Sequence, residues 1–284
     1  MTRSIDPLVS TDWLQGQLGS DGLVIIDTRP AEDYEVGHLP GAISVPFGLV
    51  SAWADSGELI LELPAEADLF KTIGDCGITM DSRVVIVGPM PEPGIPPYAL
   101  ADAVRVAATL IYAGVKNVAV LAGTYAKWAN EGRQTTTEVP QVTPVAYSST
   151  VDSDSWILTE YVKDHIGRSV IIDARDPDGY FGASKDPFVD MGGHIPTARS
   201  LPLSWVWESD GTYRPVEFIE RMAAGVIGPD KQQEVICYCS AGGYSSAWWY
   251  LLTQLLGYSN VKLYDGSLEA WVEENPIVAF TWTE

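Results

Sequence analysis

Residues 234–249 read Glu-Val-Ile-Cys-Tyr-Cys-Ser-Ala-Gly-Gly-Tyr-Ser-Ser-Ala-Trp-Trp, and this stretch contains two of the three cysteines of the chain. Residues 235–238 form an apolar run typical of a short buried strand. Cys239 follows that run, residues 240–244 are predicted to be a loop, and from Ser245 the apolar residues recur at helical spacing. A strand, a loop and a helix start place the Cys239 thiol near a helix N-terminus. Unpaired backbone N–H groups converge there and stabilise a thiolate or a bound anion.

The loop after Cys239 favours a chemical role for this thiol. It contains Gly242 and Gly243 and no proline, so its N–H groups are free to point inward as an anion-binding nest. The carboxyl end of a strand is also where open α/β sheets bind ligands. The alternative is that Cys239 is a small buried apolar residue of the core.

The rest of the chain alternates strand-like and helix-like segments. Short apolar runs predict buried strands, and the longer segments between them predict helices. This alternation favours a parallel sheet covered by helices on both faces, an α/β fold. The expected strands include 23–26, 83–87 and 118–121, and the expected helices include 8–18, 98–113 and one opening at 123–128.

The second half of the sequence repeats the first. Four stretches recur in the same order: 24–29 at 170–175, 37–42 at 193–198, 114–118 at 257–261, and 122–128 at 265–271. Tandem copies of one fold are therefore predicted. The first domain is expected at 1–133 and the second at 151–284, joined by a linker at 134–150 that is extended and contains proline.

The two copies differ at the cysteine. The strand 83–87 matches 234–238, which puts Gly88 where the second copy has Cys239. The segment that follows, 89–97, contains five prolines, and proline has no N–H to donate. We therefore expect the first domain to be catalytically inactive.

Composition excludes several classes of function. The formal net charge is −21, and the acidity is spread over both halves, so nucleic-acid binding is disfavoured. No run of 18 apolar residues is present, so no membrane span is expected. Three cysteines and three histidines, with no ligand-spaced cluster, predict neither a disulfide framework nor a metal site. Residues 1–10 lack an apolar signal core, so we expect a cytoplasmic protein, or a periplasmic one if a signal was removed.

Taken together, the repeat, the Asp-x-Arg strand ends, the Gly-His-Leu/Ile-Pro pair and the cysteine loop resemble the two-domain rhodanese-like sulfurtransferases. The resemblance covers nearly the whole chain and implies two rhodanese-like domains, of which the second is catalytic. It implies that Cys239 carries a persulfide, with no metal or organic cofactor. It also implies that this sulfur is cradled by the loop Ser240, Ala241, Gly242, Gly243, Tyr244 and Ser245.

The resemblance further implies the reaction. Cys239 would take sulfane sulfur from a small anion such as thiosulfate, or from 3-mercaptopyruvate as the less favoured donor. It would pass that sulfur to cyanide or a thiol, including a protein thiol. Asp173 and Arg175 are expected to flank the site, although their repetition as Asp27 and Arg29 favours a structural role.

The residues after Cys239 bear on two alternatives to a sulfurtransferase. A cysteine phosphatase needs an arginine six residues after its cysteine to clamp phosphate, and Ser245 stands there instead. A non-enzymatic sulfur-binding or scaffold module remains open, although the intact glycine loop favours an enzyme.

Overall fold

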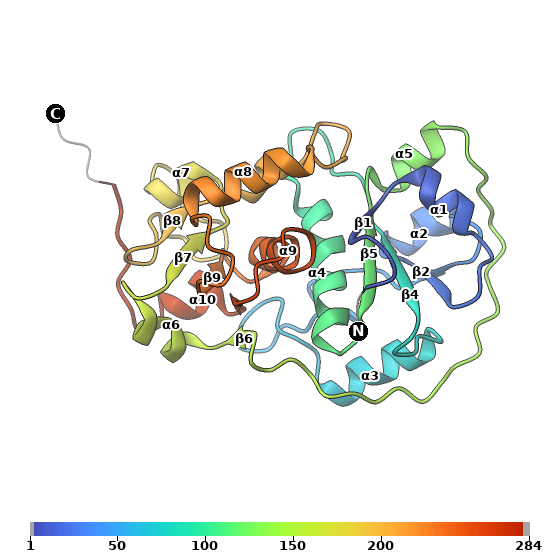
Figure 1. Ribbon diagram of the computed structural model, residues 1–284, viewed down its shortest axis with the longest axis horizontal. Coiled ribbons are helices and arrows are strands. Elements are labelled where there is room, and N and C mark those ends of the chain that lie inside the picture. Colours follow the sequence, from blue (N-terminus) through green and yellow to red (C-terminus); the bar gives the residue numbers. More distant parts are fainter. Residues whose placement is uncertain (1–2, 281–284) are drawn as a thin grey trace. The chain divides into compact units, whose positions relative to one another are not determined.

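The computed structural model describes residues 3–280, and the chain divides into two compact units (Figure 1). Unit 1 comprises the chain up to Ser56, Leu63–Asp152 and Trp207–Tyr213. Unit 2 comprises Gly57–Glu62, Ser153–Val206 and the chain from Arg214 onward. Each unit therefore contains one short segment from the other half of the sequence.

Unit 1 is a parallel five-stranded sheet with strand order β1-β5-β4-β2-β3. Its buried core includes Leu14, Ile25, Leu39, Val85 and Trp128. The strands are β1 Leu8–Val9, β2 Leu23–Asp27, β3 Ala42–Ser44, β4 Arg83–Val87 and β5 Asn117–Leu121. The helices are α1 Thr11–Gln17, α2 Ala31–Val36, α3 Glu66–Asp75, α4 Tyr98–Tyr112 and α5 Thr124–Asn130.

Unit 2 repeats this topology, with parallel strand order β6-β10-β9-β7-β8. Its strands are β6 Trp156–Ile157, β7 Val170–Asp173, β8 Arg199–Ser200, β9 Val235–Tyr238 and β10 Val261–Tyr264. Its helices are α6 Thr159–His165, α7 Pro177–Phe181, the 3-10 turn η1 Leu203–Val206, α8 Val216–Val226, α9 Gly243–Tyr250, the π-helical turn η2 Leu251–Leu255 and α10 Ser267–Trp271. Helix α9 packs on β9 and β10 (Figure 1).

The predicted α/β class and the parallel sheets are confirmed, but the expected helix over 8–18 is wrong in its first residues. Leu8 and Val9 form β1, which pairs with β5 at the sheet edge. Helix α1 begins only after Ser10, whose hydroxyl accepts the Trp13 N–H at 3.1 Å. A polar cap therefore separates two short elements that share an apolar pattern.

The two units differ by an insertion in unit 2. In both units an arginine donates to the carbonyl of a matching glycine, Arg29 to Gly37 at 2.8 Å and Arg175 to Gly193 at 2.5 Å. A histidine follows each glycine and stacks on a tyrosine, Tyr34 in unit 1 and Tyr180 in unit 2. Two residues separate the tyrosine from the glycine in unit 1, whereas twelve separate them in unit 2. We call residues 183–192 the insertion.

Among residues 3–280, no helix has both the length and the apolar character needed to cross a membrane.

Candidate active site

Cys239 lies at the point where the strand order of unit 2 reverses. The chain passes from β7 outward to β8 and then returns to β9 on the other side of β7. Asp173, the last residue of β7, is paired with Tyr238, the last residue of β9. Cys239 directly follows, so it stands at the carboxyl edge of the sheet where open α/β folds bind ligands.

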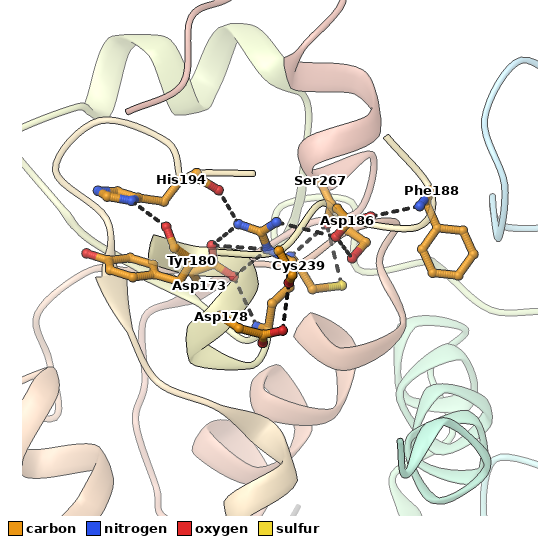
Figure 2. Close-up of polar contacts among 12 residues, drawn as sticks. Asp173, Asp178, Tyr180, Asp186, Phe188, His194, Cys239 and Ser267 are labelled. Atoms are coloured by element: carbon orange, nitrogen blue, oxygen red, sulfur yellow. Dashed lines mark hydrogen bonds and ion pairs between the residues drawn. The ribbon is translucent and has the colours of Figure 1, made fainter. Parts of the chain in front are cut away.

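The Cys239 thiol is enclosed by hydroxyl groups. Its residue is only 4% exposed. Its Sγ lies 3.4 Å from Ser245 Oγ and 3.9 Å from Ser267 Oγ. Its backbone N–H donates to Ser267 Oγ at 3.1 Å, while the Ser267 hydroxyl donates to the Tyr264 carbonyl at 2.9 Å. Two elements, α9 and α10, thus fix the position of the sulfur (Figure 2).

The helix after Cys239 begins earlier than its sequence pattern indicates. Helix α9 starts at Gly243, so the expected start at Ser245 is wrong by two residues. Gly242 takes the left-handed conformation, with φ 91°, and its carbonyl accepts the Ser246 N–H at 3.1 Å. The N–H groups of Gly243, Tyr244 and Ser245 precede that first helical bond. They lie in the first turn of the helix, which is the part of a helix that favours a bound anion.

The remaining residues of the predicted loop lie at the same place. Ala241 and Tyr244 are buried, and Ser245 is fully buried beneath the thiol. Ser240 is half-buried, and its hydroxyl donates to the carboxylate of Asp186 at 2.5 Å.

Asp173 and Arg175 form a buried ion pair, with 2.7 Å between Arg175 Nη2 and Asp173 Oδ2. The Tyr238 hydroxyl also donates to Asp173 at 2.7 Å. Burial opposes the charge of Arg175, but the Asp173 carboxylate outweighs it and raises the pKa of the guanidinium. Burial, reinforced by Asp173, raises the pKa of Tyr238 well above its ordinary value. Unit 1 contains the same ion pair between Arg29 and Asp27, at 2.7 Å.

Asp186, a residue that sequence reasoning missed, joins this ion pair to the cysteine loop. Its carboxylate lies 3.3 Å from Arg175 Nη1 and accepts the Ser240 hydroxyl (Figure 2). It also accepts the Phe188 N–H at 2.9 Å and is 5% exposed. Asp186 belongs to the insertion. The longer spacing between Tyr180 and Gly193, compared with unit 1, was the signal in the sequence that could have identified it.

Residues 57–62, from the first half of the sequence, pack on the loop that follows Cys239. A methyl carbon of Leu61 lies 3.6 Å from the position of a Cβ on Gly243. The Glu269 carboxylate accepts the Ile60 N–H at 3.2 Å, and the Glu269 N–H donates to the Ser240 carbonyl at 3.0 Å. Burial, together with nearby acidic groups, raises the pKa of Glu269. This segment therefore closes one side of the cysteine loop.

The other two cysteines are poorly suited to nucleophilic chemistry. Burial, and secondarily Asp75, raises the pKa of Cys76 to about 11. Burial raises the pKa of Cys237 well above its ordinary value, since this residue is fully enclosed in β9. A thiol with a raised pKa stays protonated at neutral pH, and only the thiolate is a strong nucleophile.

Within residues 3–280, no group of three or more histidine, cysteine or acidic residues is arranged to hold a metal ion. A cysteine at a helix N-terminus can act as a nucleophile, and the backbone N–H groups there stabilise an anionic sulfur.

Two tandem parallel α/β units, one with a cysteine at its switch point, define the class of protein, and comparison with known proteins gives the family. The sequence matches the rhodanese-like domain over residues 10–131 and 158–274. A relative from Saccharopolyspora erythraea named "Putative thiosulfate sulfurtransferase" is 31% identical over 95% of this chain and 94% of its own length. The sulfur carrier protein TtuD from Thermus thermophilus is 30% identical over 93% of each chain.

Two solved structures share the fold. EanB in complex with ergothioneine superposes with a TM-score of 0.82 at 23% identity, covering 98% of this chain and 71% of that chain. YnjE gives a TM-score of 0.79 at 22% identity, covering 97% and 69%. The chain belongs to the two-domain rhodanese-like sulfurtransferases, and it is an enzyme of the transferase class.

Proposed function

We propose that this protein transfers sulfane sulfur from a small anionic donor such as thiosulfate to a thiol or cyanide through a persulfide on Cys239. The observation that carries the proposal is the position of Cys239. Its sulfur lies 3.4 Å from the hydroxyl of Ser245, in the first turn of α9, where the helix dipole favours an anion. The names of the relatives, thiosulfate sulfurtransferase and sulfur carrier protein, support the same class of donor and an acceptor that includes protein thiols.

The first step would be attack of the Cys239 thiolate on the outer sulfur of thiosulfate. The new bond joins Cys239 Sγ to that sulfur, the sulfur–sulfur bond of the donor breaks, and its electron pair leaves with sulfite. The N–H groups at the start of α9 would stabilise the terminal sulfur of the persulfide. Hydrogen-bond donors of this kind contribute roughly 3 kcal/mol each in other enzymes.

In the second step an acceptor nucleophile would attack the terminal sulfur. A thiolate acceptor would become a persulfide, and cyanide would become thiocyanate. The bond between Cys239 Sγ and the terminal sulfur breaks, and its electron pair returns to Cys239. Ser245 would donate a hydrogen bond to the regenerated thiolate, since its Oγ lies 3.4 Å from Sγ.

Intact-mass spectrometry after incubation with thiosulfate tests the proposal. We expect an adduct of about 32 Da, one sulfur atom, that maps to Cys239 and disappears when cyanide is added. The variant Cys239→Ser should give no adduct and no turnover. Cys76→Ser and Cys237→Ser serve as controls and should retain turnover. If several donors leave wild-type Cys239 unmodified, the protein is a scaffold module and not a sulfurtransferase.

A further inference from the structure

The insertion places one of its charged residues in the site and leaves the others in solvent. Asp186 is 5% exposed and faces the cysteine loop. Lys185 and Asp190 pair with each other at 3.0 Å, and their side chains are 70% and 86% exposed. Among the described residues of the insertion, Asp186 is therefore the one charged residue that contacts the cysteine loop, and its charge is negative.

Hydrogen-bond donors surround the Asp186 carboxylate. Arg175 Nη1 and the Ser240 hydroxyl both approach Oδ2, and the Phe188 N–H donates to Oδ1 (Figure 2). Three donors hold this carboxylate in one position. Ser240 directly follows Cys239, so Asp186 is hydrogen-bonded to the residue next to the nucleophile.

Arg175 does not need Asp186 for its own structural role. In unit 1, Arg29 makes the same bonds to Asp27 and to a glycine carbonyl, and its guanidinium lies 3.6 Å above the Tyr125 ring. Unit 1 has neither the insertion nor a cysteine at the position that matches Cys239, where Gly88 stands. Asp186, the second carboxylate that pairs with Arg175, is therefore present in the unit that contains Cys239 and is not required by a buried arginine as such.

The local charge around the loop is negative as a result. The positive charge of Arg175 is matched by Asp173, which leaves Asp186 uncompensated. Glu269 adds a second carboxylate near the loop. This residue is half-buried, and its backbone N–H donates to the Ser240 carbonyl. A charge in a partly desolvated site acts more strongly on a ligand than it would in water.

We infer that Asp186 is a specificity-determining residue that selects sulfur donors of low negative charge over dianions. The inference rests on the proposed function and names the substrate class for it. A monoanionic thiosulfonate carries the same transferable sulfur as thiosulfate but one negative charge less. Its reaction balances in the same way, because the broken sulfur–sulfur bond leaves its electron pair on a sulfinate in place of sulfite. Asp186 repels the dianion about twice as strongly as the monoanion.

Steady-state kinetics with thiosulfate and methanethiosulfonate, at one fixed acceptor concentration, test this inference. We expect Asp186→Asn to raise kcat/KM about tenfold for thiosulfate and about threefold for the monoanion, mainly through KM. Asp190→Asn is the matched control, since it removes the same charge from the exposed end of the insertion. It should change neither value by more than about twofold.

Two further variants separate charge from position. Ser240→Ala removes the hydrogen bond but keeps the charge, so the ratio of the two kcat/KM values should stay at its wild-type value. Ser240→Lys places a cation against Asp186 and should shift the ratio toward thiosulfate, which keeps the test available if Asp186→Asn fails to fold. A ratio unchanged in both charge-altering variants, with the Cys239 adduct still formed, overturns the inference and leaves the proposed function standing. Absence of the adduct in the wild type overturns both.

Discussion

At the scale of single residues, the two repeats share an unusual backbone conformation at matching positions, but the hydroxyl there makes a different hydrogen bond in each repeat. Ser267 and its counterpart Thr124 both take positive φ, 51° and 64°, so this strained turn belongs to the fold. In unit 1 the Thr124 hydroxyl accepts the Ala126 N–H. In unit 2 the Ser267 hydroxyl accepts the N–H of Cys239. A backbone feature common to both copies thus helps to position Cys239 in unit 2.

Cys76 offers a test of pH dependence. Burial raises its pKa to about 11, against an ordinary value near 9.0 in the unfolded chain. Between these values the unfolded chain loses the proton while the folded chain keeps it, so the stabilisation is present below pH 9 and declines above it. We expect the free energy of unfolding to fall by about 2 kcal/mol at pH 10.5 through this group.

Urea unfolding of the wild type and of Cys76→Ala at pH 8 and pH 10.5 measures the effect. The wild type should lose about 2 kcal/mol more over this interval than the variant does. Equal losses in both proteins would show that Cys76 is not shielded in solution.

At the scale of elements, the start of α9 decides how many N–H groups face the thiol. Gly242 has φ 91° because the chain must turn from β9 into α9 within four residues. The sequence pattern identified the strand, the cysteine and the helix. It placed the helix start two residues late because the apolar spacing begins only after Ser245, whereas the start depends on the backbone conformation of a glycine.

Gly242→Ala should therefore damage both stability and turnover. A side chain at positive φ costs about 1–2 kcal/mol, and relief of that strain would move the N–H groups at the start of α9. We expect the urea midpoint to fall and turnover with thiosulfate to drop at least about tenfold.

Gly225→Ala is the matched control for this substitution. Gly225 lies in α8, is exposed, and has open space where a Cβ would be. An alanine there should raise the free energy of unfolding by up to about 1 kcal/mol and leave turnover unchanged. Equal effects of the two substitutions would contradict the role given to Gly242.

The contacts of the insertion could not be predicted from the sequence, whereas the strands and the duplication could. Apolar runs predicted the central strands β2, β4, β5 and β9, and the repeated stretches predicted the duplication, because both depend on local patterns. The contact between Asp186 and Ser240 joins residues 54 positions apart and depends on how an irregular segment folds back. No periodicity encodes such a contact. The link between Ile60 and Glu269, 209 positions apart, was missed for the same reason.

At the scale of the whole molecule, the compact units and the sequence repeats do not coincide. Residues 57–62 belong to unit 2, and residues 207–213 belong to unit 1, where Gly211 accepts the Gly123 N–H at 3.1 Å. Leu61 is 8% exposed although its φ is 58°, a strained value for a leucine. Packing in unit 2 therefore holds this residue in place.

Leu61→Ala should consequently loosen the cysteine loop. We expect a loss of about 2–3 kcal/mol in the free energy of unfolding. We also expect at least about fivefold faster alkylation of Cys239, because Leu61 covers Gly243 at the start of α9. Leu49→Ala, at a position that is 51% exposed in the same half of the sequence, should change neither quantity. Unchanged alkylation in Leu61→Ala would mean that residues 57–62 do not shield the thiol.

The exchange of segments also bears on how such a duplicated gene can change. Here the hexapeptide 57–62 lies against the helix that begins beside Cys239, so selection for sulfur chemistry in one half extends to a loop encoded in the other. A substitution in this hexapeptide would therefore act on the packing beside Cys239 from the other half of the sequence.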